Sequence, residues 1–108
     1  DCYNANPASM AAALQTVSRF GTNCRRIALL GDMLELGDQT MTAHREVGRL
    51  VADLGYDHLV VTGSFVRHVV CGARDRGMAE GRIHVFVELP EISNWLYSEM
   101  VNGRLKEG

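Results

Sequence analysis

Three short apolar runs, separated by stretches of helical periodicity, constrain the fold more than any other feature. "RRIALLG" at 25–31, "HLVVTG" at 58–63 and "IHVFVE" at 83–88 suit strands that are buried on both faces. Apolar residues recur at helical spacing before, between and after these runs, at 7–20, 41–54, 65–77 and 90–100. In the last of these stretches the spacing predicts that Ile92, Trp95, Leu96 and Met100 face inward. Because parallel strands need crossover helices, the order α-β-α-β-α-β-α predicts a Rossmann-like, three-layer α/β domain with a mainly parallel sheet.

Individual residues indicate where these helices begin and end. Pro7 and Pro90 fit a first helical turn, where the missing proline N–H costs no hydrogen bond. Ser64 is placed to cap the third helix, and Gly55 is placed to end the second in a left-handed conformation.

The chain is predicted to be one domain, residues 1–108, that belongs to a larger protein. Its 46% apolar and 22% charged residues suffice for one modest core, and no linker or internal repeat interrupts the pattern. Because the pattern starts and ends on a helix, we expect truncated flanking strands before Asp1 and after Gly108.

Composition and motifs argue against several classes of function. The net charge of −2, with no basic cluster longer than Arg25–Arg26, disfavours a nucleic-acid partner. The three cysteines have no C-x-x-C spacing and are expected to be reduced thiols of a cytoplasmic protein. No apolar stretch approaches the ~20 residues that span a bilayer. The four histidines lack metal-ligand spacing, no serine or cysteine has the setting of a catalytic nucleophile, and no phosphate-binding glycine motif is present.

Polar residues concentrate where strands of the predicted sheet end. "DCYNAN" at 1–6 follows an inferred strand, and "GDMLELG" at 31–37 follows the run at 25–31. In an open parallel sheet, ligands bind beyond the carboxyl ends of the strands. We therefore expect these two segments to share the ligand-binding edge.

The first segment allows two interpretations. Asn6 has the position of a helix N-cap whose side chain bonds the amide of residue 8 or 9, which accounts for Asn6 and Pro7. That role leaves Asp1, Tyr3 and Asn4 unexplained. An aromatic face with carboxylate and amide groups at a helix N-terminus could instead hold a nucleoside.

The second segment also allows two interpretations. Asp32 and Glu35 can be solvated acids of a glycine-bounded turn. Alternatively, two carboxylates at the end of a strand could orient an ammonium group or a metal ion.

Taken together, the motifs D-x-Y-N-A-N-P-x-S-M and R-R-I-A-L-L-G-D-M-L-E-L-G, with H-R-E-V-G after them, resemble the C-terminal domain of the Mur ligases. The resemblance extends over residues 1–63 by motif, and over the rest only by the order of strands and helices. Within the family it favours the branch that adds D-alanyl-D-alanine, because sister ligases carry an aspartate directly followed by Y-x-H-x-P, and those that add diaminopimelate carry D-N-P-R.

The resemblance implies an ATP-dependent amide ligase of peptidoglycan precursor synthesis. Such an enzyme phosphorylates the terminal carboxylate of UDP-N-acetylmuramoyl-tripeptide, and the amine of D-alanyl-D-alanine attacks the acyl phosphate. The N-terminal UDP-sugar domain and the central ATPase domain, which holds most of the ATP and Mg²⁺ contacts, lie outside this chain. We therefore expect no catalytic residue within it and no activity from it alone.

Position by position, the resemblance assigns two groups of residues. Asp1 would bond the ribose hydroxyls of ATP, and Tyr3, Asn4 and Asn6 would line the nucleotide side of the closed site. The loop residues Asp32, Met33 and Glu35 would face the acceptor dipeptide and the reacting carboxylate. Two alternatives stay open: a related ligase of other specificity, such as a folyl-polyglutamate or other amino-acid-adding enzyme, and a non-catalytic α/β binding module.

Overall fold

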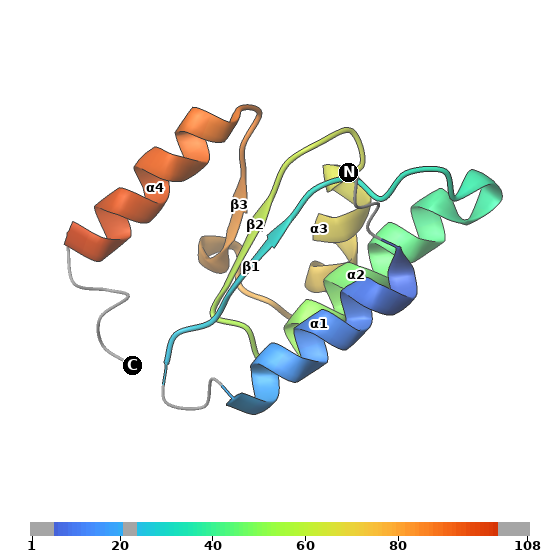
Figure 1. Ribbon diagram of the computed structural model, residues 1–108, viewed down its shortest axis with the longest axis horizontal. Coiled ribbons are helices and arrows are strands. Elements are labelled where there is room, and N and C mark those ends of the chain that lie inside the picture. Colours follow the sequence, from blue (N-terminus) through green and yellow to red (C-terminus); the bar gives the residue numbers. More distant parts are fainter. Residues whose placement is uncertain (1–5, 21–23, 102–108) are drawn as a thin grey trace.

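The protein forms an α/β domain around a three-stranded parallel sheet. A computed structural model describes residues 6–20 and 24–101. In chain order the elements are α1 (Pro7–Phe20), β1 (Ile27–Leu30), the 3₁₀ turn η1 (Gly37–Gln39), α2 (Thr40–Asp53), β2 (His58–Val61), α3 (Val66–Asp75), the 3₁₀ turn η2 (Glu80–Arg82), β3 (Ile83–Val85) and α4 (Leu89–Val101) (Figure 1). The described strands lie in the order β1-β2-β3, with Ile27 opposite His58 and Leu59 opposite Ile83. The predicted α/β class, element order and parallel sheet are confirmed.

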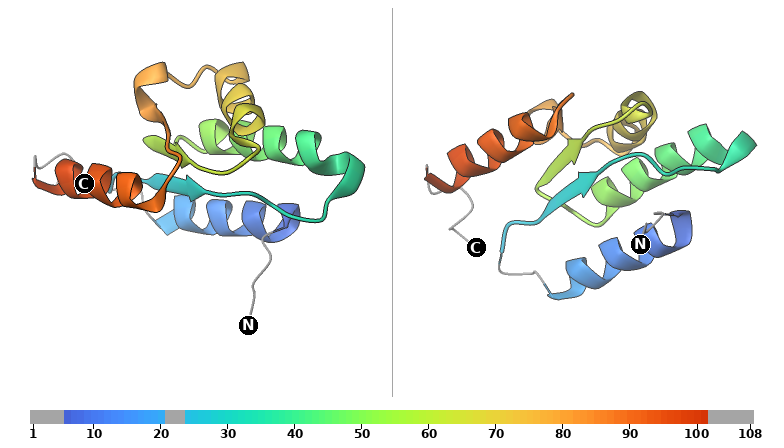
Figure 2. Two further views of the ribbon diagram at one scale, coloured as in Figure 1. Left: turned by 90° about the horizontal axis from the view of Figure 1, so that it is seen from above. Right: turned by 45° about the horizontal axis from the view of Figure 1, so that its top comes forward.

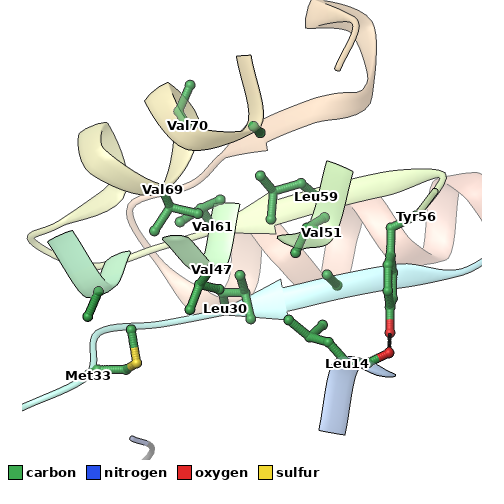
Figure 3. Close-up of a cluster of buried hydrophobic side chains, with 13 residues drawn as sticks. Leu14, Leu30, Met33, Val47, Val51, Tyr56, Leu59, Val61, Val69 and Val70 are labelled. Atoms are coloured by element: carbon green, nitrogen blue, oxygen red, sulfur yellow. Dashed lines mark hydrogen bonds between the residues drawn. The ribbon is translucent and has the colours of Figure 1, made fainter. Parts of the chain in front are cut away.

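Helices cover both faces of the sheet and make three layers. α1, α2 and α3 lie next to one another on one side, and α4 lies on the other (Figure 2). The main core lies under α2 and α3, where Leu59 and Val61 of β2 meet Val51 of α2 and Val69 of α3 (Figure 3). These side chains are at most 2% exposed. Val60, which lies between the two β2 residues and faces the other way, is also fully buried, and this accounts for the apolar run at 59–61.

Two glycines allow α2 and α3 to pack backbone against backbone. A Cβ atom on Gly48 would lie 1.9 Å from the carbonyl oxygen of Val69, and one on Gly72 would lie 1.9 Å from that of Arg45. No side chain fits at those distances. The two helices therefore form one tightly joined layer.

The amino ends of the strands are tied together through Tyr56 and Arg26. The buried Tyr56 hydroxyl donates to the Leu14 carbonyl of α1 at 2.8 Å (Figure 3). The Arg26 guanidinium donates to the carbonyls of Ser18 and Gly55 and lies over the Tyr56 ring. Gly55 has the left-handed backbone predicted for the end of α2, with φ of 76°.

The structure corrects the expected bounds and one helix face. β2 and β3 end two or three residues before the predicted ends of their runs. In α4, Ile92 faces inward as its spacing predicts, but Met100 is exposed and Glu99 takes the buried position. No helix among the described residues has the length and apolar character needed to cross a membrane.

Candidate functional site at the carboxyl edge of the sheet

The loop after β1 is fastened to the start of α3. Asp32, the second residue after β1, accepts hydrogen bonds from the backbone N–H groups of Ser64 and Phe65 at 2.9 and 3.1 Å. A carboxylate at a helix N-terminus satisfies otherwise unpaired amides and is favoured by the helix dipole. Asp32 is thus a capping group as well as a loop acid, and neither of its oxygens is merely solvated.

This contact explains Gly63 and corrects the predicted role of Ser64. A Cβ atom on Gly63 would lie 2.4 Å from a carboxylate oxygen of Asp32, and the φ of Gly63 is 112°. Only glycine suits that conformation beside that carboxylate. The N-cap of α3 is Phe65 and not Ser64, and the carboxylate of Asp32 from the neighbouring loop accepts from the amides of both residues.

Met33 and His44 hold the same loop from beneath. The Met33 side chain is 1% exposed and belongs to the main core (Figure 3). Its backbone N–H donates to Nε2 of His44 at 3.0 Å. Met33 therefore anchors the loop, and its side chain does not reach the surface where a substrate would bind.

Glu35 is the exposed acid of the loop and has an unusual backbone. Its φ is 61°, which makes it the one described residue other than glycine with a left-handed conformation. That conformation costs a β-carbon-bearing residue roughly 1–2 kcal/mol, and such strain often accompanies function. The side chain of Glu35 is the loop carboxylate best placed to meet a ligand.

The N-terminus of α1 lies at this same edge, since α1 and α2 run side by side in one direction (Figure 1). Asn6 and Ser9 cap it reciprocally. The Ser9 N–H donates to Oδ1 of Asn6 at 2.9 Å, and the Asn6 N–H donates to Oγ of Ser9 at 3.3 Å. The predicted cap is confirmed. Because Oδ1 is engaged, the amide nitrogen is the Asn6 group suited to a nucleotide.

The remaining residues predicted to bind nucleotide, Asp1, Tyr3 and Asn4, lie outside the described residues. The other segments meet as their strand ends predict, because Asp32 bonds directly to the start of α3. The interpretation of the sequence missed the part played by His44 and Gly63. The only signal for His44 was its place on the inward stripe of α2, and Gly63 offered only its place at a strand end.

One cavity among the described residues begins beside this edge. A cavity of about 260 Å³ opens between α1 and α2, lined by Pro7, Ala11, Ala43 and Val47 among others. Pro7 follows Asn6 directly, so the cavity begins next to the α1 cap. None of its lining residues belongs to loop 31–36, so this cavity does not connect the two segments of the candidate site.

A separate polar cluster lies on the opposite face of the sheet. Nδ1 of His58 and Nε2 of His84 are 3.1 Å apart, and both rings contact Trp95 of α4. Burial lowers the pKa of both histidines; for His84 the neighbouring His58 adds to the effect, and Glu99 opposes it. Through these ring contacts with Trp95 the pair joins α4 to the sheet. Within residues 6–20 and 24–101, no three side chains of metal-ligating type gather into a possible metal site.

Comparison with known proteins decides the family. The sequence profile described as "Mur ligase, glutamate ligase domain" matches residues 1–104. The chain belongs to the Mur ligase family. It is 37% identical over 73 residues to the UDP-N-acetylmuramoyl-tripeptide--D-alanyl-D-alanine ligase of Bacillus subtilis, a match that covers 68% of this chain. It is 36% identical over 109 residues to the ligase of the same name from Treponema pallidum, a match that covers all of this chain.

Solved structures agree with this Mur ligase assignment. A crystal structure of MurF from Acinetobacter baumannii superposes with a TM-score of 0.74 and 31% sequence identity, and covers 94% of this chain. The same match covers 20% of that protein. The chain likewise spans 16% and 22% of the length of the Bacillus and Treponema ligases. The chain therefore corresponds to a minor part of these relatives.

Proposed function

We propose that this chain is the C-terminal domain of a cytoplasmic ligase that joins D-alanyl-D-alanine to UDP-N-acetylmuramoyl-tripeptide with consumption of ATP. The proposal rests on similarity over the whole of this chain to a UDP-N-acetylmuramoyl-tripeptide--D-alanyl-D-alanine ligase, together with a loop that hydrogen bonds hold in place at the carboxyl edge. Transfer of the γ-phosphoryl group from ATP to the tripeptide carboxylate, with release of ADP, would make an acyl phosphate that is a good electrophile. The domain would deliver the amine, which forms the amide bond as phosphate leaves.

On this proposal the two segments at the carboxyl edge of the sheet contact different substrates. Asp1, Tyr3, Asn4 and Asn6 would face the nucleotide at the N-terminus of α1. A helix N-terminus attracts anions, and the Asn6–Ser9 cap supports this placement because it fixes the direction in which α1 begins.

Loop 31–36 would face the acceptor dipeptide. Glu35 is the group that we assign to the dipeptide, because its carboxylate is exposed and an ammonium group is its natural partner. Asp32 and Met33 would lie near the reacting groups but act by holding the loop, since the Asp32 oxygens and the Met33 N–H are engaged within the protein.

ATP and Mg²⁺ would be held mainly by parts of the enzyme beyond this chain. The described residues fit an accessory role: the α1 N-terminus suits an anion, whereas the same residues include no cluster of metal-ligating type. Bound Mg²⁺ neutralises phosphate charge during phosphoryl transfer. The chain's own contribution would be to close over the nucleotide and exclude water.

The experiment is an ATPase assay of the full-length enzyme. We expect phosphate release only when UDP-N-acetylmuramoyl-tripeptide and D-alanyl-D-alanine are both present, with formation of the amide product. If L-glutamate or another amino acid replaced the dipeptide with equal effect, the specificity would be wrong. If neither acceptor stimulated hydrolysis, the ligase assignment of the whole protein would be wrong.

A further inference from the structure

The buried side chain of His44 joins loop 31–36 to α2, and the proposed function gives this residue no role. We propose that His44 is a positioning residue for loop 31–36, because it fixes the Met33 backbone and thereby the place of Glu35. The inference rests on the proposed function, since it assigns the loop to the acceptor dipeptide.

The two hydrogen bonds of the His44 ring are compatible with only one tautomer. Nε2 accepts the Met33 N–H at 3.0 Å, so that nitrogen carries no proton. Nδ1 lies 2.7 Å from the Thr40 carbonyl and must therefore be the protonated nitrogen, which donates to that carbonyl. Both ring nitrogens are engaged, one with α2 and one with the loop. The ring cannot turn without breaking both contacts.

The ring also touches the third partner of the site. Its centroid lies 4.8 Å from that of Phe65, whose backbone N–H is held by Asp32. One side chain thus contacts the loop, α2 and the start of α3. α2 and α3 pack backbone against backbone at Gly48 and Gly72. His44 therefore attaches the loop to this closely packed pair of helices.

The filling of space alone does not explain why a histidine occupies position 44. His44 is 1% exposed, and an apolar side chain of similar size would occupy the same volume. It would leave the buried Met33 N–H without its acceptor, which the loop would relieve by moving. Glu35 lies two residues further on, so movement at Met33 displaces the group that we assign to the dipeptide.

Substitutions that keep one ring contact at a time test the proposal in the full-length ligase. His44→Gln can present its amide oxygen near the position of Nε2, whereas the shorter His44→Asn reaches only the position of Nδ1. His44→Leu keeps neither contact. Since a buried hydrogen bond is worth a factor of about ten, we expect KM for D-alanyl-D-alanine to rise roughly tenfold in the Asn and Leu variants and less than about threefold in the Gln variant. KM for ATP should stay within about twofold of the wild-type value, because the lost contact is on the acceptor loop.

Val47→Ala is the matched control, because Val47 lies almost one turn further along the same buried stripe of α2. It should lower the melting temperature and leave KM for the dipeptide unchanged. An unchanged dipeptide KM in the Asn and Leu variants would overturn the proposal. So would equal increases for ATP and dipeptide that merely track the loss of stability.

A second measurement separates this inference from the proposed function. Hydrogen exchange of the Met33 amide in the full-length protein should be slow in the wild type and His44→Gln, and at least about tenfold faster in His44→Asn and His44→Leu. This readout does not require turnover. If the wild type failed to use the dipeptide, the proposed function would fail while exchange still tested the anchor, and equal protection in all four proteins would overturn the anchor itself.

Discussion

The two faces of the sheet differ in how completely this chain covers them. Under α2 and α3, Leu30 of β1 is 4% exposed and lies in the main core. On the other face its neighbour Leu29 is 54% exposed. Both sites of the candidate loop's attachment, His44 and the start of α3, belong to the well-packed side. Loop 31–36 is thus attached to the better-packed side of the sheet.

The largest effect should come from separating α2 and α3. In Gly48→Ala the added methyl group would clash with the Val69 carbonyl, so the helices must move apart. We expect a loss of about 3 kcal/mol or more in the free energy of unfolding, measured by urea denaturation. Gly81→Ala is the control, because no atom lies within 4 Å of the added methyl there. Equal stability of the two variants would contradict the close packing.

Adjacent leucines of β1 give a matched test of the two faces. Leu30→Ala should cost about 3 kcal/mol, as for a buried leucine, and Leu29→Ala less than about 1 kcal/mol. Urea denaturation of both variants measures the difference. Similar costs for the two would mean that the second face is packed as well as the first.

Much of the fold followed from local sequence rules, but the attachments of the site did not. The bounds of α1 match the prediction, because Asn6, Pro7 and Ser9 define its start by short-range contacts. The caps of α3 could not be assigned from its own residues, since Asp32 comes from another loop over thirty positions earlier. A rule that considers only neighbouring residues therefore predicted Ser64 as the cap.

Helical periodicity also failed to predict which residues are buried on the second face of the sheet. Helical spacing predicted that Met100 lies on the inward face of α4, but the structure buries Glu99 and exposes Met100. His58 and His84 are far apart in sequence and meet only because β2 and β3 pair in a particular register. Such long-range pairings depend on the assembled sheet.

The smallest predicted effect is a pH response confined to the second face. Because the pKa values of His58 and His84 are lowered from 6.5, chiefly by burial, the unfolded chain binds protons more readily than the folded one as the pH falls below that value. Stability contributed by the neutral pair is present above pH 6.5 and is lost as the pH falls through the folded pKa values. Glu99 and Asp57 oppose the shift, while Arg25 and Arg82 reinforce it for His58.

Fluorescence of the single tryptophan, Trp95, measures this response directly. Its emission should change as the pH falls below about 6.5, before far-ultraviolet circular dichroism reports any loss of α2 and α3. His58→Gln combined with His84→Gln should remove the early change. A simultaneous loss of both signals would mean that the two faces unfold as one unit.

The central claim is that the two segments at the carboxyl edge serve different substrates of one ligase. Steady-state KM values for ATP and D-alanyl-D-alanine in full-length Asp1→Ala and Glu35→Gln enzymes test it most directly. Since one charge-assisted hydrogen bond is worth about tenfold, Asp1→Ala should raise KM for ATP by about that factor and spare the dipeptide, and Glu35→Gln should do the reverse. An unchanged KM for ATP in Asp1→Ala, or both substitutions acting on the same substrate, would contradict the account.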